Sequence, residues 1–294
     1  MLETDKIIID VENCIKCRRC TLVCPRSLYI FKDERLELVD NFDSECIDCG
    51  HCSAVCPQGV IKLKLYSDKP LIPIPGNDDK ASYEQLYNLS ISRRSIRNFK
   101  KKIVPKEILE KILKLVQYSP TGHNEENVYY TIVQDQETLN RFSEEITKNI
   151  SNFVKKYEDP EGYESLKKIL SEDALKKAGE FVESFKRKIS EIEAGKEVWR
   201  WNTQIIIIHS PKNAATLVEN CTLAAAHFML AAETLGIATC SLGYATALIN
   251  QFRSVAKIVK IPRNHIVGYT LAFGYPKFEY KFIPNRKSIK INWL

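Results

Sequence analysis

The sequence lacks long apolar runs, and outside one region it has few cysteines. No uninterrupted apolar stretch reaches the roughly 18 residues that a membrane helix needs, and the acidic start Met-Leu-Glu-Thr-Asp is not followed by the apolar core of a secretory signal. Only Cys221 and Cys240 lie outside the cysteine-rich region, which leaves no disulfide framework. These absences argue against membrane and secreted proteins, and we expect a protein of the reducing cytoplasm.

Glycine-rich phosphate loops are also missing. None of the 11 glycines stands at the G-x-G-x-x-G spacing that opens a dinucleotide-binding helix. A Rossmann domain is therefore not expected, and a second cofactor would have to be held by other means.

Charge is divided unevenly along the chain. Residues 1–65 hold nine Lys and Arg against eleven Asp and Glu, whereas the whole chain carries a net charge of +6, so the remainder carries +8. A basic balance of this size can indicate nucleic-acid binding. A phosphate-bearing cofactor, together with an acidic redox partner, explains it better, and we expect neither nucleic acid nor a membrane as a partner.

Eight of the ten cysteines form two copies of one pattern. Each copy reads C-x2-C-x2-C-x3-C-P, the spacing that places thiolates around a cubane iron–sulfur cluster. Zinc knuckles and secreted disulfide domains are the alternatives, but neither needs this doubled pattern. The first copy is Cys14, Cys17, Cys20 and Cys24 before Pro25, and the second is Cys46, Cys49, Cys52 and Cys56 before Pro57.

The fourth cysteine of each copy is expected to serve the opposite cluster, because a short loop with three cysteines cannot enclose a cube. The predicted ligand sets are Cys14, Cys17, Cys20 and Cys56 for one [4Fe–4S] cluster, and Cys46, Cys49, Cys52 and Cys24 for the other. Between the copies, residues 28–31 and 36–39 flank a polar turn and predict a β-hairpin. Residues 1–65 resemble the two-cluster bacterial-type ferredoxins. Exposed clusters oxidise readily, which suggests an anaerobic host.

Beyond residue 65 the pattern changes to helices that alternate with short strands. Residues 66–84 contain three prolines and no periodicity, and they predict an extended linker. The elements expected in the rest of the chain are helices at 82–92, 105–116, 137–198 (broken at 159–162) and 217–235, and strands at 129–133, 205–208 and 266–273. This order predicts an α+β layered domain, which we place at residues 85–294.

A compact basic motif lies at the start of this domain. Ser92-Arg-Arg-Ser-Ile-Arg-Asn-Phe99 holds three arginines and a serine within five positions, a set that can grip phosphate. A surface basic patch is the alternative. The companions of this motif are Leu115-Val-Gln-Tyr-Ser-Pro-Thr-Gly-His-Asn124, Leu235-Gly-Ile-Ala-Thr-Cys-Ser-Leu-Gly243, Gly274-Tyr-Pro276 and Pro284-Asn-Arg-Lys287. In this order the set resembles the nitroreductase family of FMN flavoproteins, and the whole chain resembles the ferredoxin–nitroreductase fusions within that family.

The resemblance implies a set of FMN-binding residues and a domain-swapped homodimer. The implied contacts are Arg93, Arg94, Ser95 and Arg97 to the phosphate and ribityl chain; Pro120, Thr121, Gly122 and Asn124 to the flavin across the dimer interface; the backbone amides of Leu242 and Gly243 to the flavin edge; and Arg286, or Lys287 beside it, to the phosphate. The loop after the proline departs from the family's common Asn-x-Gln-Pro-Trp, since it reads Asn124-Glu-Glu-Asn-Val128 and places two carboxylates there.

No catalytic side chain is assigned, because the flavin itself carries the chemistry. His123 is a candidate proton donor, although a histidine in such a loop is more often a simple hydrogen-bonding residue. Tyr244 is a candidate for stacking near the substrate.

The clusters and the resemblance together predict an oxidoreductase. Electrons would pass through two [4Fe–4S] clusters to FMN and on to a small acceptor, such as a nitroaromatic, a quinone or another conjugated compound. Reduced free ferredoxin is the expected donor, and NAD(P)H is the alternative. A second hypothesis is an electron-transfer module that docks to a larger redox complex and has no small-molecule substrate of its own.

Overall fold

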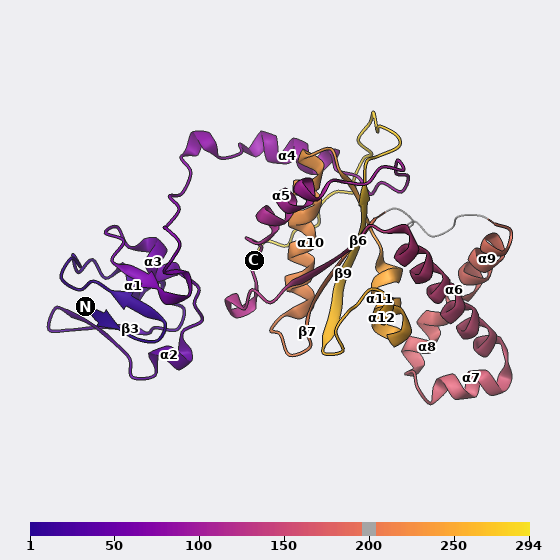
Figure 1. Ribbon diagram of the computed structural model, residues 1–294, viewed down its shortest axis with the longest axis horizontal. Helices are drawn as coiled ribbons and strands as arrows, with labels where there is room; N and C mark the ends of the chain where they lie inside the picture. Colours follow the sequence, from indigo (N-terminus) through magenta and orange to yellow (C-terminus); the bar gives the residue numbers. More distant parts are fainter. Residues whose placement is uncertain (196–203) are drawn as a thin grey trace. The chain divides into compact units, whose positions relative to one another are not determined.

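The computed structural model describes residues 1–195 and 204–294 and divides the chain into two compact units (Figure 1). The first unit is Met1–Ala81 with Gly122–Glu125, and the second is Ser82–Thr121 with Glu126–Leu294. The last residues of the predicted helical stretch, 196–198, lie outside the described residues. No helix in the described ranges is both long enough and apolar enough to cross a bilayer.

The first unit is built from short strands and short helices. One sheet has the order β1-β2-β5, and a separate hairpin pairs β3 with β4 in antiparallel register, as predicted. The strands are β1 (Leu2–Glu3), β2 (Ile7–Ile9), β3 (Tyr29–Lys32), β4 (Arg35–Leu38) and β5 (Ile61–Leu63), and the helices are α1 (Arg19–Val23), α2 (Phe42–Glu45) and α3 (His51–Val55). The core is small, with Ile7, Ile9, Phe42 and Ile61 among its best-buried side chains. A core of this size needs help from a metal, a disulfide or a partner.

A four-stranded sheet forms the centre of the described part of the second unit. Its order is β6-β7-β9-β8, and every pairing is antiparallel. The strands are β6 (Tyr129–Val133), β7 (Ile205–Pro211), β8 (Ala238–Ser241) and β9 (His265–Gly274). The α+β prediction is confirmed, and the antiparallel pairing distinguishes the fold from the parallel sheet of a Rossmann domain.

Helices cover both faces of this sheet (Figure 1). The side chains of β7 alternate between the two faces, so each face has apolar residues to bury. Ile206 and Ile208 pack on one face with α5 (Lys106–Val116) and α10 (Leu217–Thr234). Gly268 of β9 lets α10 approach closely, since a Cβ atom there would lie 2.4 Å from the Cβ of Cys221.

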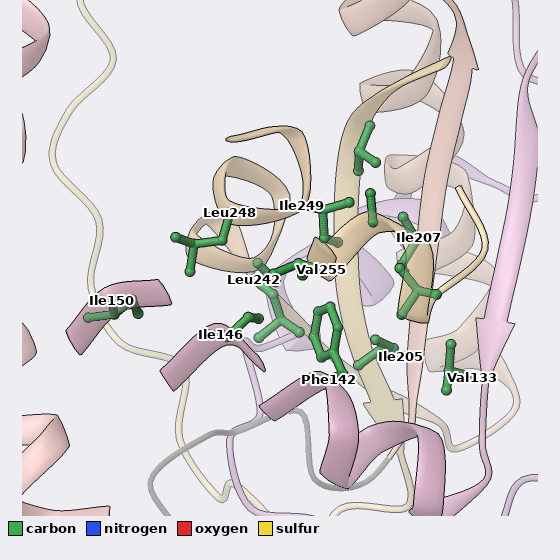
Figure 2. Close-up of a cluster of buried hydrophobic side chains, with 14 of the residues drawn as sticks. Val133, Phe142, Ile146, Ile150, Ile205, Ile207, Leu242, Leu248, Ile249 and Val255 are labelled. Carbon is green, nitrogen blue, oxygen red and sulfur yellow. The ribbon is translucent and has the colours of Figure 1, made fainter. Parts of the chain in front are cut away.

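On the other face, Ile205 and Ile207 pack with three helices. These are α6 (Gln136–Glu158), α11 (Gly243–Gln251) and α12 (Arg253–Ile258). Figure 2 shows Phe142 of α6 between Ile146 and Ile205 in this cluster. Sequence analysis missed α11, α12 and β8.

The helical stretch after β6 is confirmed as far as the described residues reach, including its break. The elements that follow α6 are α7 (Pro160–Lys167), α8 (Glu172–Gly179) and α9 (Val182–Glu193). Asp159 accepts a hydrogen bond from the N–H of Gly162 and so caps α7, while Pro160 suits its first turn. Val182 and Phe185 tie α9 to the α6 side of the core.

Two segments of the second unit expose apolar side chains. Helix α4 (Tyr83–Ser92) begins with a complete capping box from Ser82 and Gln85, yet it buries no residue. Residues 277–294 have no regular structure and are exposed throughout. Neither segment contributes a buried side chain to the core of its own chain.

Candidate functional site

The two cysteine runs fold as structural repeats that lie 32 positions apart. Left-handed backbone conformations occur at matching positions of both runs, and such turns form the N–H concavities of many iron–sulfur sites. The matching pairs are Lys16 with Asp48, Arg18 with Gly50, and Ser27 with Gly59. A short helix, α1 or α3, follows the second left-handed residue of each run, Arg18 or Gly50, and leads to the fourth cysteine.

One cavity in the first unit is lined by four cysteines from both runs. They are Cys24, Cys46, Cys49 and Cys52, the set that sequence analysis assigns to one cluster. Burial removes the Cys46 and Cys52 thiols from water and thereby raises their pKa. Four thiols around one cavity are a donor set that fits a cubane, in which each iron takes one thiolate.

The remaining cysteines form the second group. Burial raises the pKa of the Cys20 thiol to about 11, and the nearby Cys14 and Cys17 add to this shift. Cys56 ends α3 and is half-buried. Its place as the fourth ligand of this group stays a prediction.

The arginine motif lies beside strand β8 in the second unit. Ser95 pairs with Thr239 in a parallel bridge, and the N–H of Ile96 donates to the Thr239 carbonyl at 2.9 Å. Ile96 is buried and anchors the segment. Because β8 runs directly into Leu242 and Gly243, this pairing brings two motifs that are distant in sequence to one place.

Two buried polar atoms near this pairing have no hydrogen-bond partner within the described ranges. They are Nε of Arg94 and Oγ1 of Thr239. An unpaired buried donor costs about 1–3 kcal/mol, so a polar ligand that bonds them would be stabilised. This pair of atoms fits the phosphate and polar edge of a flavin nucleotide. Arg93, beside them in sequence, interacts with Glu233 and opposes the rise that burial causes in the pKa of that carboxyl.

The turn after Leu242 presents backbone donors at the start of α11. The N–H of Leu242 already donates to the Thr270 carbonyl at 2.9 Å, whereas the first intrahelical bond of α11 starts at Thr246. The N–H groups of Gly243 and Tyr244 therefore lie in the unbonded first turn. A Cβ atom at Gly243 would meet nothing within 4 Å, so a flat group has room to approach this backbone.

Aromatic side chains gather next to this turn. The ring of Tyr244 meets Phe181 edge-on at 5.5 Å and Phe185 at 5.8 Å between ring centroids. Tyr244 and Phe181 are each 39% exposed, while Phe185 is buried behind them. We call these three residues the aromatic wall.

The other predicted flavin residues of the second unit are exposed or only partly buried. Arg97 and Pro120 are exposed, and Thr121 accepts a hydrogen bond from the N–H of Glu126. Arg286 lies in the exposed 277–294 segment, where the structure shows no hydrogen bond or ion pair for it among the described residues.

The loop residues Gly122, His123 and Asn124 belong to the first unit. His123 is exposed and has a φ of 52°, and Asn124 donates to the Asp48 carbonyl at 3.3 Å.

Comparison with known proteins identifies both parts of the chain. Residues 13–61 match the 4Fe-4S dicluster domain, and residues 91–275 match the nitroreductase family. The chain belongs to the nitroreductase family. Its relatives in that family include an iodotyrosine deiodinase of Thermotoga neapolitana, 27% identical over 66% of this chain and 89% of the relative. A candidate NADH dehydrogenase/NAD(P)H nitroreductase of Archaeoglobus fulgidus is 24% identical over 68% of this chain and 90% of the relative.

Solved structures of the family share the fold. A nitroreductase with bound FMN from Bacteroides fragilis has a TM-score of 0.51 at 19% identity, and the match covers 71% of this chain and 98% of that one. A BluB-like flavoprotein from Clostridium difficile 630 also has a TM-score of 0.51, at 16% identity, covering 69% and 94%.

Sequence analysis of this nitroreductase-family chain missed three residues that the geometry singles out. Thr239 is one of them, although its position between Gly236 and Gly243, inside one of the family motifs, could have indicated it. Phe181 lies in a charged helical stretch and carries no local sign of a site. Tyr29, which lines the cysteine cavity, could have been found by aligning the two cysteine repeats.

Proposed function

We propose that this protein is an FMN-dependent oxidoreductase that takes electrons through two [4Fe–4S] clusters and delivers them to a small conjugated acceptor. The observation that carries this proposal is the pairing of Ser95 with Thr239, which joins the arginine motif to the Gly243 turn. Membership of the nitroreductase family supports it, as does the FMN in the Bacteroides fragilis structure.

Three groups of this chain would hold FMN. Arg94 would donate its orphaned Nε–H to the phosphate, and its fixed charge suits a phosphate dianion. Thr239 would satisfy its hydroxyl on the same ligand. The Gly243 N–H, rather than that of Leu242, would donate to the flavin edge, because the Leu242 N–H is already bonded to Thr270.

The cysteine sets explain why a cluster domain is joined to this family. A cubane carries one electron at a time, whereas FMN can accept two and pass a hydride or single electrons onward. The cysteines would keep each cluster partly shielded, since most of them are buried or half-buried. Free ferredoxin is then the fitting donor, and NAD(P)H is the alternative.

The aromatic wall supports a flat acceptor. Tyr244 and Phe181 expose ring surface beside Gly243, and aromatic rings stack best on other planar groups. A nitroaromatic or a quinone has such a surface. The competing hypothesis of a pure electron-transfer module does not explain why these rings are exposed.

The apolar surfaces that the second unit leaves uncovered support a homodimer. Tyr83 of α4 is 75% exposed, and Phe282, Ile289 and Trp293 of the 277–294 segment are each more than 80% exposed. A monomer rarely shows so much apolar surface. A second copy that exchanges these segments would bury it and would bring Arg286 to a phosphate site. Sedimentation equilibrium should give twice the chain mass, and a variant ending at residue 276 should sediment as a monomer with less FMN.

The decisive test is an anaerobic titration of the holoprotein with reduced ferredoxin, NADH and NADPH in separate experiments, following cluster and flavin absorbance. The expected result is that reduced ferredoxin bleaches the flavin and that the Cys20→Ala/Cys46→Ala variant, which lacks both clusters, loses this route. Cys240→Ala, which removes a buried thiol outside the clusters, is the control. If a pyridine nucleotide bleaches the flavin first and the clusters follow, electrons flow outward and the module hypothesis is favoured. A holoprotein without flavin would refute the proposal.

A further inference from the structure

Tyr29 carries a buried hydroxyl without a conventional partner. The residue begins β3 and is 5% exposed, and its hydroxyl makes no hydrogen bond of normal geometry within the described ranges. Leaving such a group unpaired is costly, so native structures rarely do it without a reason. A group that belongs beside Tyr29 must accept a hydrogen bond from this hydroxyl.

The surroundings of Tyr29 identify that acceptor. Tyr29 lines the same cavity as Cys24, Cys46, Cys49 and Cys52. Its hydroxyl lies beside the Cys52 sulfur. The ring is fixed by Phe42, which meets it edge-on at 5.6 Å between centroids. The donor is therefore held rigidly at one cluster site.

The second repeat has no such donor. Tyr29 follows Cys24 by five positions, and the residue five positions after Cys56 is Ile61. Both begin a strand and both are buried, at 5% and 2% exposure. The repeats thus share the backbone but place a hydroxyl in one position and an alkyl group in the other.

We propose that the Tyr29 hydroxyl donates a hydrogen bond to the Cys52 sulfur and gives the cluster held by Cys24, Cys46, Cys49 and Cys52 the higher midpoint potential of the two. Reduction of that cluster adds one electron and no proton, and the Tyr29 O–H bond stays intact. The added negative charge spreads onto the sulfurs, so a donor stabilises the reduced form more than the oxidised form. At equilibrium the first electron that reaches the two clusters therefore occupies this one. The proposal depends on the two clusters and not on FMN.

Tyr29→Phe removes only the hydroxyl and keeps the packed ring. The full-length holoprotein would be titrated anaerobically against potential and followed by EPR. The equilibrium constant for reduction of one cluster should fall about fivefold. At 59 mV per tenfold change, this lowers the midpoint potential of that cluster by about 40 mV. The other midpoint and the iron content should stay the same. Tyr66→Phe is the matched control, because Tyr66 lies in the same unit but does not line the cavity.

A second substitution gives the opposite sign. Replacing Tyr29 by 3-fluorotyrosine keeps the hydroxyl and makes it a stronger donor, so the same midpoint should rise. A merely structural role for Tyr29 predicts no such rise. Unchanged midpoints, equal shifts of both clusters, or a rise in Tyr29→Phe would overturn the proposal. If Tyr29→Phe loses iron, the fluorotyrosine protein decides alone, and an unmoved midpoint there overturns the proposal. Wild-type protein without two clusters would refute the cluster assignment as well, and iron analysis shows this before any variant is made.

Discussion

The two units build their sites in opposite ways. In the first unit, the eight predicted cluster ligands come from two short runs whose spacing alone indicates their chemistry, and few core side chains lie around them. In the second unit, no short run is sufficient. The site depends on a strand pairing between Ser95 and Thr239 and on a sheet covered by two apolar clusters. The first unit should therefore depend on its clusters for stability, and the second on its core.

The largest effect is expected from removing cysteines in pairs chosen across the two runs. Cys24→Ala/Cys46→Ala removes two ligands of one predicted set and should leave about half of the iron. Cys20→Ala/Cys24→Ala removes one ligand from each set and should leave almost none, together with loss of the folded first unit. Iron and sulfide analysis measures both. The reverse result would show that each run holds its own cluster.

How far the sequence could predict the molecule follows the same division. The β3–β4 hairpin and β6 lie where their patterns place them, because neighbouring residues determine them. Strand β8 has only four residues, Ala238–Ser241, which are too few to show a period. Its bridge to Ser95 is a long-range contact that no local pattern encodes. The flavin residues are inferred from family resemblance, whereas the cysteine ligands are predicted from their spacing, and both sets stay predictions.

Phe142→Ala tests whether the second unit depends on its core. Phe142 is fully buried between α6 and the sheet (Figure 2), and truncation should cost about 3–5 kcal/mol of the free energy of unfolding. Urea unfolding followed by helical circular dichroism measures this loss. Cluster absorbance should persist at urea concentrations that unfold the helices. Glu144→Ala, an exposed change on the same helix, should stay within about 0.5 kcal/mol. Joint loss of clusters and helices would show that the two units unfold as one.

Arg94→Gln should weaken FMN binding while leaving the iron content unchanged. Hydrogen bonds to charged groups contribute about 1.5–3 kcal/mol, so the dissociation constant should rise roughly 10- to 100-fold. Arg94→Lys keeps the charge but loses the Nε donor, so its dissociation constant for FMN should lie between those of the wild type and Arg94→Gln. Lys101→Gln removes an exposed charge near the motif and is the control. Equal losses in Arg94→Gln and Lys101→Gln would mean that only the general field of positive charge matters.

The smallest effect concerns pH and should be confined to the second unit. His209 is buried at the end of β7, where it contacts His265 at 2.8 Å and Thr131 at 3.1 Å, and burial lowers its pKa to about 4. The unfolded chain takes up the proton near pH 6.5, so below that pH it binds more protons than the folded chain. Stability should be complete above pH 6.5 and should fall by about 1–3 kcal/mol as the pH approaches 4. His209→Asn should flatten this slope in urea unfolding, whereas His51→Gln in the first unit should preserve it. A slope that survives in His209→Asn would place the titrating group elsewhere, with the partly exposed His265 as the next residue to test, because burial lowers its pKa too.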